Sequence, residues 1–191
     1  MRATGRLRRS CFAVAASLFA AAALAAGLDG PCVVRSADLR LQDGVYRLDA
    51  RLDLPVGAAV RRGLADGVPL SLAIDIEITR VRRFLPDADI ADLTQHYHLQ
   101  YNAVSARYIL RNDNSGQQQS LPTAEAAIAE MSVVHDLPVL DKSLVPPGSR
   151  YEANVRATVD YGTVPMTLRI LMFWVSEWHR ESSWYTWTLK R

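Results

Sequence analysis

Two closely spaced histidines are the first residues whose types and spacing could support chemistry. His96 and His98 are separated by one residue, which places both side chains on one face of a β-strand. Imidazole binds Zn²⁺, but a zinc site needs a third and usually a fourth ligand, which His135, His179 or a carboxylate could supply. The pair therefore predicts either a metal site, used by a metal-dependent hydrolase together with nearby carboxylates, or two strand-surface histidines without a ligand.

A second pair, Asp75 and Glu77, also lies on one face of a predicted strand. Two neighbouring carboxylates could perform acid–base catalysis if burial raised the pKa of one of them. The alternative is the polar face of a half-buried strand, with Arg80 or Arg82 as ion-pair partner. The sequence contains no motif for a serine nucleophile, a zinc protease or a phosphate-binding loop. We therefore assign no catalytic residue and no cofactor.

The end of the chain is rich in aromatic residues and contains all four tryptophans. If exposed, such a stretch would stack on sugars or dock a protein, whereas if buried it would fill the core. Trp184 and Tyr185 are adjacent, so on a strand they point to opposite faces, and at least one lies off the main core face. The predicted partner-binding residues are Trp178, Trp184, Tyr185 and Trp187.

Residues 1–25 have the three parts of a secretory signal peptide. Four arginines precede an apolar run from Cys11 to about Ala26, and Ala23-Leu24-Ala25 offers small residues to signal peptidase. The apolar run is shorter than the ~20 residues of a membrane span, which favours cleavage over inner-membrane anchoring by an uncleaved leader. We expect export to the periplasm, with 26–191 as a single domain that contacts membrane only if the leader is retained.

Charge and cysteine usage narrow the partners of that domain. Four of the 22 Lys and Arg residues lie in the leader, so the remaining chain carries 18 of them against 20 Asp and Glu. A slightly acidic domain without a basic cluster is a poor candidate for nucleic acid or anionic lipid. Cys32 would be the single cysteine after cleavage, so no internal disulfide forms, and we expect it to be buried.

Hydrophobic alternation with period two dominates the chain and predicts a mainly β protein. A hairpin with paired surface charges is expected around Asp43-Gly44, and 80–90 is expected to be a loop or an edge segment. The expected helices span 56–65 and 123–131, the latter capped by Thr123. The expected strands span 37–41, 46–54, 70–78, 93–101, 107–111, 151–159, 166–175 and 184–189.

The hairpin connections and the absence of a βαβ rhythm favour an antiparallel β-sandwich with two short helices. A turn with Pro146, Pro147 and Gly148 leads into Tyr151 at the start of a strand. This arrangement resembles the tyrosine corner of immunoglobulin-like domains. The expected fold is therefore a sandwich of immunoglobulin-like style.

A set of short segments along the whole predicted mature chain resembles a known family. They are Ala37-Asp38-Leu39-Arg40-Leu41, Gly67-Val68-Pro69-Leu70, Ile76-Glu77-Ile78-Thr79-Arg80, Leu99-Gln100-Tyr101-Asn102, Ser176-Glu177-Trp178 and Ser182-Ser183-Trp184-Tyr185-Thr186-Trp187. The family is the proteobacterial domain-of-unknown-function family 4390 (DUF4390). The resemblance implies an exported envelope protein without an established activity, often encoded near a membrane sensor histidine kinase.

These observations favour a non-enzymatic periplasmic binding or accessory module, with an envelope or inner-membrane protein such as the sensor histidine kinase as its partner. The first alternative is the metal-dependent periplasmic hydrolase that would use His96 and His98. The second alternative is a structural envelope protein without a small ligand.

Overall fold

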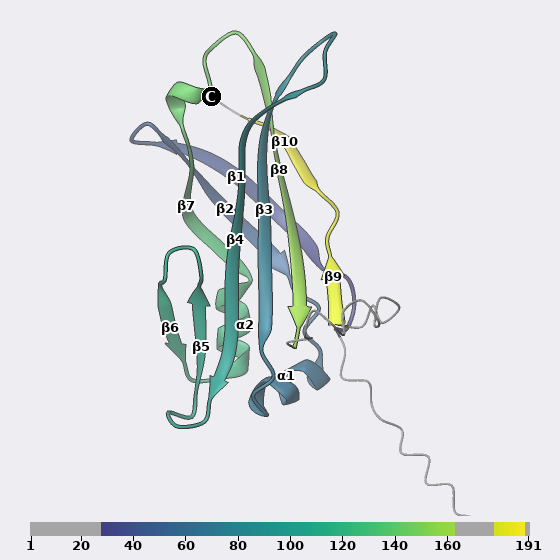
Figure 1. The fold of residues 1–191 in the computed structure, drawn as a ribbon, viewed down its shortest axis with the longest axis vertical. Coiled ribbons are helices and arrows are strands. Elements are labelled where there is room, and N and C mark those ends of the chain that lie inside the picture. Colours follow the sequence, from purple (N-terminus) through teal and green to yellow (C-terminus); the bar gives the residue numbers. More distant parts are fainter. Residues whose placement is uncertain (1–27, 163–177, 190–191) are drawn as a thin grey trace, which may run out of the picture.

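The computed structural model of the chain describes residues 28–162 and 178–189. It is a sandwich of two antiparallel sheets with short helices at its margin (Figure 1). The smaller sheet has the order β1-β2-β7 and the larger one has the order β10-β8-β3-β4-β5-β6, with β9 also pairing with β8. A mainly β antiparallel sandwich with two α-helices is thereby confirmed.

The smaller sheet consists of β1 (Val33–Gln42), β2 (Val45–Asp53) and β7 (Val133–Asp141). The β1–β2 turn is the predicted Asp-Gly turn, because Asp43 and Gly44 both have positive φ angles, of 51° and 82°. Such a turn matches the twist of the flanking strands. The predicted first hairpin is confirmed.

The larger sheet is built around the long strand β3, which pairs with β4 on one side and with β8 on the other. Its strands are β3 (Leu70–Val81), β4 (Ala88–Asn102), β5 (Arg107–Asn112), β6 (Gln118–Leu121), β8 (Arg150–Tyr161), β9 (His179–Glu181) and β10 (Tyr185–Thr188). Every strand pairing in the described part of the chain is antiparallel.

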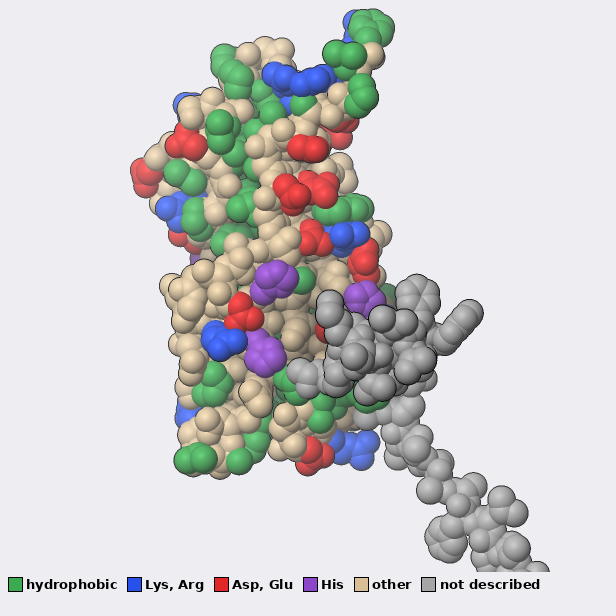
Figure 2. All heavy atoms as spheres, in the orientation of Figure 1, with side chains coloured by type: hydrophobic (Ala, Val, Ile, Leu, Met, Phe, Trp, Pro, Cys, Tyr) green, Lys and Arg blue, Asp and Glu red, His purple; other side chains and the backbone are tan. Residues whose placement is uncertain are grey.

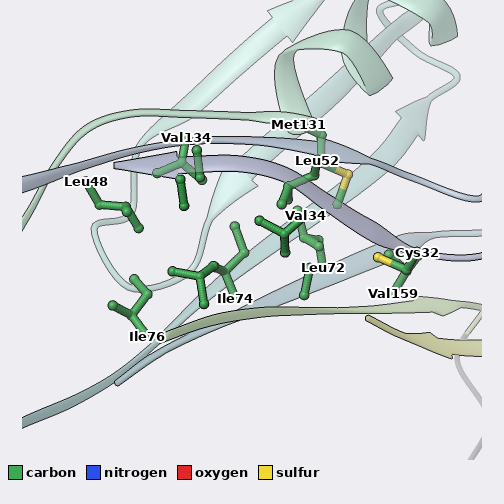
Figure 3. Packing of buried hydrophobic residues seen from close by; sticks show 14 of the residues in the cluster. Cys32, Val34, Leu48, Leu52, Leu72, Ile74, Ile76, Met131, Val134 and Val159 are labelled. Atoms are coloured by element: carbon green, nitrogen blue, oxygen red, sulfur yellow. The ribbon is translucent and has the colours of Figure 1, made fainter. Parts of the chain in front are cut away.

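The core lies between the two sheets, where alternate residues of each strand are buried (Figure 3). Leu72, Ile74 and Ile76 of β3 face Leu48 and other apolar side chains of the smaller sheet. The same period-two pattern sends the polar residues of β3 to the opposite, outer face. The core therefore fixes which side chains β3 presents to solvent.

Three short helical segments complete the described fold: α1 (Ala58–Ala65), α2 (Ala124–Met131) and the 3₁₀ helix η1 (Lys142–Leu144). The Thr123 side chain accepts a hydrogen bond from the backbone N–H of Ala126, as the N-cap prediction requires. None of the helices in the described residues has the length and apolar character needed to span a bilayer.

The predicted loop or edge segment at 80–90 agrees with the structure, in which β3 ends at Val81, β4 begins at Ala88 and 82–87 connect them. The structure adds three strands that were not expected, namely β6, β7 and β9. Strand β6 falls in a glutamine run that gave no alternation signal. Strand β7 was also missed, because register irregularities and the positive φ of Asp136 disturb its period-two pattern. The predicted strand at 166–175 lies outside the described residues.

Two local predictions from the sequence agree with the structure. The Tyr151 hydroxyl lies 3.4 Å from the Pro146 carbonyl oxygen and donates to it, which is the contact that defines a tyrosine corner. Cys32 is buried, with 4% of its surface exposed, and burial followed by the negative charge of Asp53 raises the pKa of its thiol to about 11. Cys32 is therefore an unreactive thiol at neutral pH.

Candidate functional site

The outer face of the larger sheet brings together most of the residues that the sequence singles out. Asp75 and Glu77 point outward from β3, because Leu72, Ile74 and Ile76 occupy the inward positions. Antiparallel register then places Arg156 of β8 and Thr94 of β4 on either side of Asp75. This polar face is the candidate site.

Arg156 is the centre of this arrangement. Its Nη2 atom lies 3.0 Å from the Asp75 carboxylate, and its Nη1 atom lies 2.5 Å from the Glu181 carboxylate. The Thr94 hydroxyl donates a 2.9 Å hydrogen bond to the other Asp75 oxygen. The hydrogen bond to Asp75 and the charges of both acids raise the pKa of Arg156 above its ordinary value. Asp75 therefore pairs with Arg156 rather than with Arg80 or Arg82.

Trp184 covers this ion-pair cluster from the solvent side. Its ring centroid lies 4.5 Å from the Arg156 guanidinium carbon, a cation–π distance, and the residue is 37% exposed. The segment before it is anchored by buried Ser182, whose N–H donates to the Ala157 carbonyl and whose hydroxyl accepts from the Ala157 N–H. Trp184 is consequently an exposed aromatic ring held in one position.

The other three predicted partner-binding residues have a different environment. Trp178 stacks on Tyr161, with 5.4 Å between ring centroids and 7° between ring planes. Tyr185 and Trp187 pair in register with Val155 and Ala153, so their side chains point toward the core. All three are partly buried and pack against the core. The described geometry therefore leaves Trp184 as the aromatic centre of the exposed face.

Acidic side chains gather next to this cluster on the same outer face (Figure 2). Asp92 of β4 lies directly opposite Glu77 in register, and Asp89 lies opposite Thr79, two residues further along β3. Burial raises the pKa of Glu77, and the like charges of Asp92 and Asp89 raise it further, whereas Arg156 acts in the opposite direction. The patch thus carries negative charge that its neighbours do not fully balance.

The histidine pair also lies on this face, but its two members have separate surroundings. The His98 Nδ1 atom lies 3.2 Å from the Ser71 hydroxyl oxygen. His96 is exposed, and its backbone N–H donates to the side-chain oxygen of Asn114. His179 contacts Asp160 at 2.8 Å, and His135 contacts Asp49 on the smaller sheet at 2.7 Å. The four histidines are therefore divided among different partners.

No set of three His, Cys, Asp or Glu side chains within 28–162 and 178–189 is arranged to hold a metal ion. Neither His135 nor His179 joins the pair at 96 and 98, because each of them contacts a carboxylate of its own. The metal-dependent hydrolase stays a prediction, which metal analysis of the purified protein would test.

Sequence reasoning missed Arg156 and Ser182, which hold the exposed ring in place. Arg156 occupies an ordinary outward position of an alternating strand, so its type and spacing do not distinguish it from other surface arginines. Its role follows from the register of β8 against β3 and from the return of the chain through β9. A cation–π partner for Trp184 could therefore be found only after the strands were paired.

Comparison with known proteins places the chain in one family. The family described as "Domain of unknown function (DUF4390)" matches residues 30–188, which is nearly the whole chain. A search of curated proteins and a search of solved structures found no match.

Proposed function

The chain belongs to the DUF4390 family, whose function is unknown, and we propose that it is an exported, non-enzymatic binding module that docks an envelope protein through the outer face of its larger sheet. The observation that carries this proposal is the exposed Trp184 ring, which is fixed over Arg156. Exposed aromatic and arginine side chains are frequent centres of protein interfaces, because they bury much area at little entropic cost. The leader supports export.

The charges around Trp184 suggest the chemistry of the partner. Glu77, Asp89 and Asp92 form a negative border beside the ring, whereas Arg156 is already neutralised by Asp75 and Glu181. A complementary surface would offer an apolar pocket for the indole and basic side chains around it. An inner-membrane sensor histidine kinase is the candidate partner, because members of the family are often encoded near such a kinase.

Site-specific photocrosslinking in the producing cell tests the proposal. A photoreactive amino acid replaces Ser183, an exposed residue beside Trp184, in the full-length protein. The matched control replaces Val104, which is fully exposed in the β4–β5 turn. We expect one dominant envelope protein crosslinked from position 183 and not from position 104. N-terminal sequencing of the same samples shows whether the leader is removed.

The variant Trp184→Ala then links the crosslink to the aromatic ring. We expect the crosslink from position 183 to fall at least tenfold, since central interface aromatics contribute about 2 kcal/mol or more. Val133→Ala, which shortens an exposed side chain on the smaller sheet, is the matched control and should leave the crosslink unchanged. An undiminished crosslink in Trp184→Ala would exclude the ring as the docking point.

A further inference from the structure

The β3–β4 hairpin projects from one end of the sandwich and carries an apolar tip with basic flanks (Figures 1 and 2). Strand β8 begins at Arg150, the register partner of Val81, so the hairpin residues beyond Val81 have no neighbour from β8. Phe84 is 91% exposed and Leu85 is 65% exposed. A large aromatic and a large aliphatic side chain therefore lie together in solvent at the most distant point of the hairpin.

Three arginines lie directly before this apolar pair in the hairpin. Arg80, Arg82 and Arg83 precede Phe84, and none of them forms an ion pair with a carboxylate of the described chain. The guanidinium carbon of Arg83 lies 5.9 Å from the Phe84 ring centroid. With Asp87 as the single acid between positions 80 and 87, the tip is locally cationic although the domain as a whole is slightly acidic.

The conformation of the tip is set by the protein itself. The Asp87 carboxylate accepts a 2.9 Å hydrogen bond from the backbone N–H of Arg82, which closes the turn across its base. Asp87 is thereby occupied within the loop, and the register pair of Arg80 and Ala88 fixes the position where the two strands diverge. Phe84 and Leu85 are held outward without any contribution from a ligand.

We propose that this hairpin tip, comprising residues 80–87, inserts Phe84 and Leu85 into the interface of an anionic lipid bilayer while its arginines bind the headgroups. A protein interface of ordinary strength needs a broad patch, of about 800 Å² per partner, which a narrow convex tip does not offer. The interfacial layer of a bilayer, by contrast, accepts apolar side chains to a depth of about 5–10 Å. Arginine side chains extend naturally from that depth to the phosphates.

The charge distribution of the domain gives this contact a defined orientation. Glu77, Asp89 and Asp92 lie on the outer sheet face immediately behind the tip, and an anionic surface repels them. The molecule therefore approaches with the hairpin end first, and the acidic face and Trp184 stay in water. The outer face proposed above as a protein-docking surface is then free while the tip is inserted.

The tip is also far from the point where the described chain begins. Arg180 donates to the Leu28 carbonyl and pairs with Val159, which itself pairs with Leu72 of β3. Leu72 precedes Val81 by nine residues, a distance of ~30 Å along a strand. A contribution of the leader to membrane binding can consequently be measured separately from that of the tip.

A fluorescent label at the tip tests insertion directly. The environment-sensitive dye NBD is attached to Phe84→Cys in protein recovered after export, with Cys11→Ser in the leader and with Cys32 left in place because it is buried. Val104→Cys, at the exposed β4–β5 turn, is the matched control. With vesicles of phosphatidylglycerol and phosphatidylcholine, we expect a blue shift and a rise in intensity at position 84 and neither at position 104.

Binding measurements on tip variants test the two parts of the contact. We expect Phe84→Ser with Leu85→Ser to lower the vesicle partition coefficient about tenfold or more, and Val104→Ser to leave it unchanged. Arg82→Gln with Arg83→Gln should lower it about fivefold per charge on anionic vesicles and hardly at all on phosphatidylcholine vesicles. Circular dichroism of each variant should match that of the parent, because all these side chains are exposed.

An aqueous spectrum at position 84 in the presence of anionic vesicles would overturn the proposal, as would equal partitioning of the parent and the Phe84→Ser, Leu85→Ser variant. Loss of a crosslinked envelope protein in that variant, without any vesicle binding by the parent, would assign the tip to a protein and would equally overturn it. Trp184→Ala should bind vesicles like the parent. Failure of the membrane contact and failure of the Trp184 docking surface are therefore distinguishable.

Discussion

The charged side chains on the two outer faces of the sandwich are arranged differently. On the smaller sheet, charged side chains of β1, β2 and β7 pair with one another across the strands; the pairs are Arg35–Asp53, Arg40–Asp49, Arg47–Asp136 and His135–Asp49. On the larger sheet, Glu77 lies opposite Asp92, and these like charges add to the effect of burial in raising the pKa of Glu77. Around these ion pairs the smaller face is balanced, whereas the larger face keeps a local excess of negative charge around Glu77.

The balance on the smaller sheet depends on diagonal rather than direct neighbours. Arg40 lies directly opposite Arg47 in register, yet each reaches an acid, Asp49 for the first and Asp136 of β7 for the second. The alternating charges of the first hairpin thus form ion pairs within the smaller sheet, as their pattern predicts. Alternating charge along a strand therefore does not by itself indicate a function. Charge that stays unbalanced after the strands have paired can indicate one.

The largest expected effect comes from removing Arg156, the cation that pairs with Asp75 and partly offsets the like charges around Glu77. Arg156→Leu leaves Asp75, whose side chain is 22% exposed, without its ion-pair partner and removes the support under Trp184. We expect the free energy of unfolding, measured by urea denaturation, to fall by about 2 kcal/mol. Arg40→Leu on the smaller sheet is the control and should cost no more than about 0.5 kcal/mol. Equal losses would mean that the two faces do not differ energetically.

The fold was largely predictable from the sequence, because one buried face imposes strict alternation on a strand. Strand β3 is the clearest case, with every second residue from Leu70 to Ile78 buried. Strand β7 could not be predicted, since its irregular pairing with β2 breaks that period and Pro138 interrupts the pattern. Strand identity is thus a local property of the sequence only where the pairing is regular.

The candidate site was predictable only in part, because it depends on neighbours that are distant in the chain. The sequence identifies Trp184 and indicates that it or Tyr185 faces solvent, but the support from Arg156 comes through strand pairing across 28 positions. The hairpin tip was missed for a related reason. The net charge of the domain is slightly negative and conceals three closely spaced arginines, Arg80, Arg82 and Arg83, at one end of the fold.

A smaller effect is expected on the balanced face. Asp49 is partly buried, which by itself raises its pKa, but hydrogen bonds from the Asp136 N–H, Arg40 and His135 outweigh burial and lower it. The stabilisation that comes from a lowered folded-state pKa is fully present above the unfolded pKa of about 3.9. It is lost as the pH falls through the folded-state pKa. Asp49→Asn should therefore cost about 1 kcal/mol at pH 7 and progressively less below pH 4. A cost that persists at about pH 2 would show that packing rather than charge is responsible.

The smallest effect, of opposite sign, is expected on the unbalanced face. Burial first, and then Asp92 and Asp89, raise the folded-state pKa of Glu77, so its ionisation at neutral pH opposes folding. Glu77→Gln removes that cost and should stabilise the protein by about 0.5 kcal/mol at pH 7, after allowance for solvent screening. The gain should vanish below the unfolded pKa of about 4.3, where Glu77 is protonated in both states.

Glu152→Gln, which removes a carboxylate paired with Arg150 on the same face, is the matched control for that measurement and should be neutral or slightly destabilising. Urea denaturation at pH 4 and pH 7 distinguishes the two variants. A loss of stability in Glu77→Gln at pH 7 would mean that Glu77 is held by a favourable partner after all. The larger sheet would then be as well balanced as the smaller one, and its negative charge could no longer be attributed to an absent basic partner.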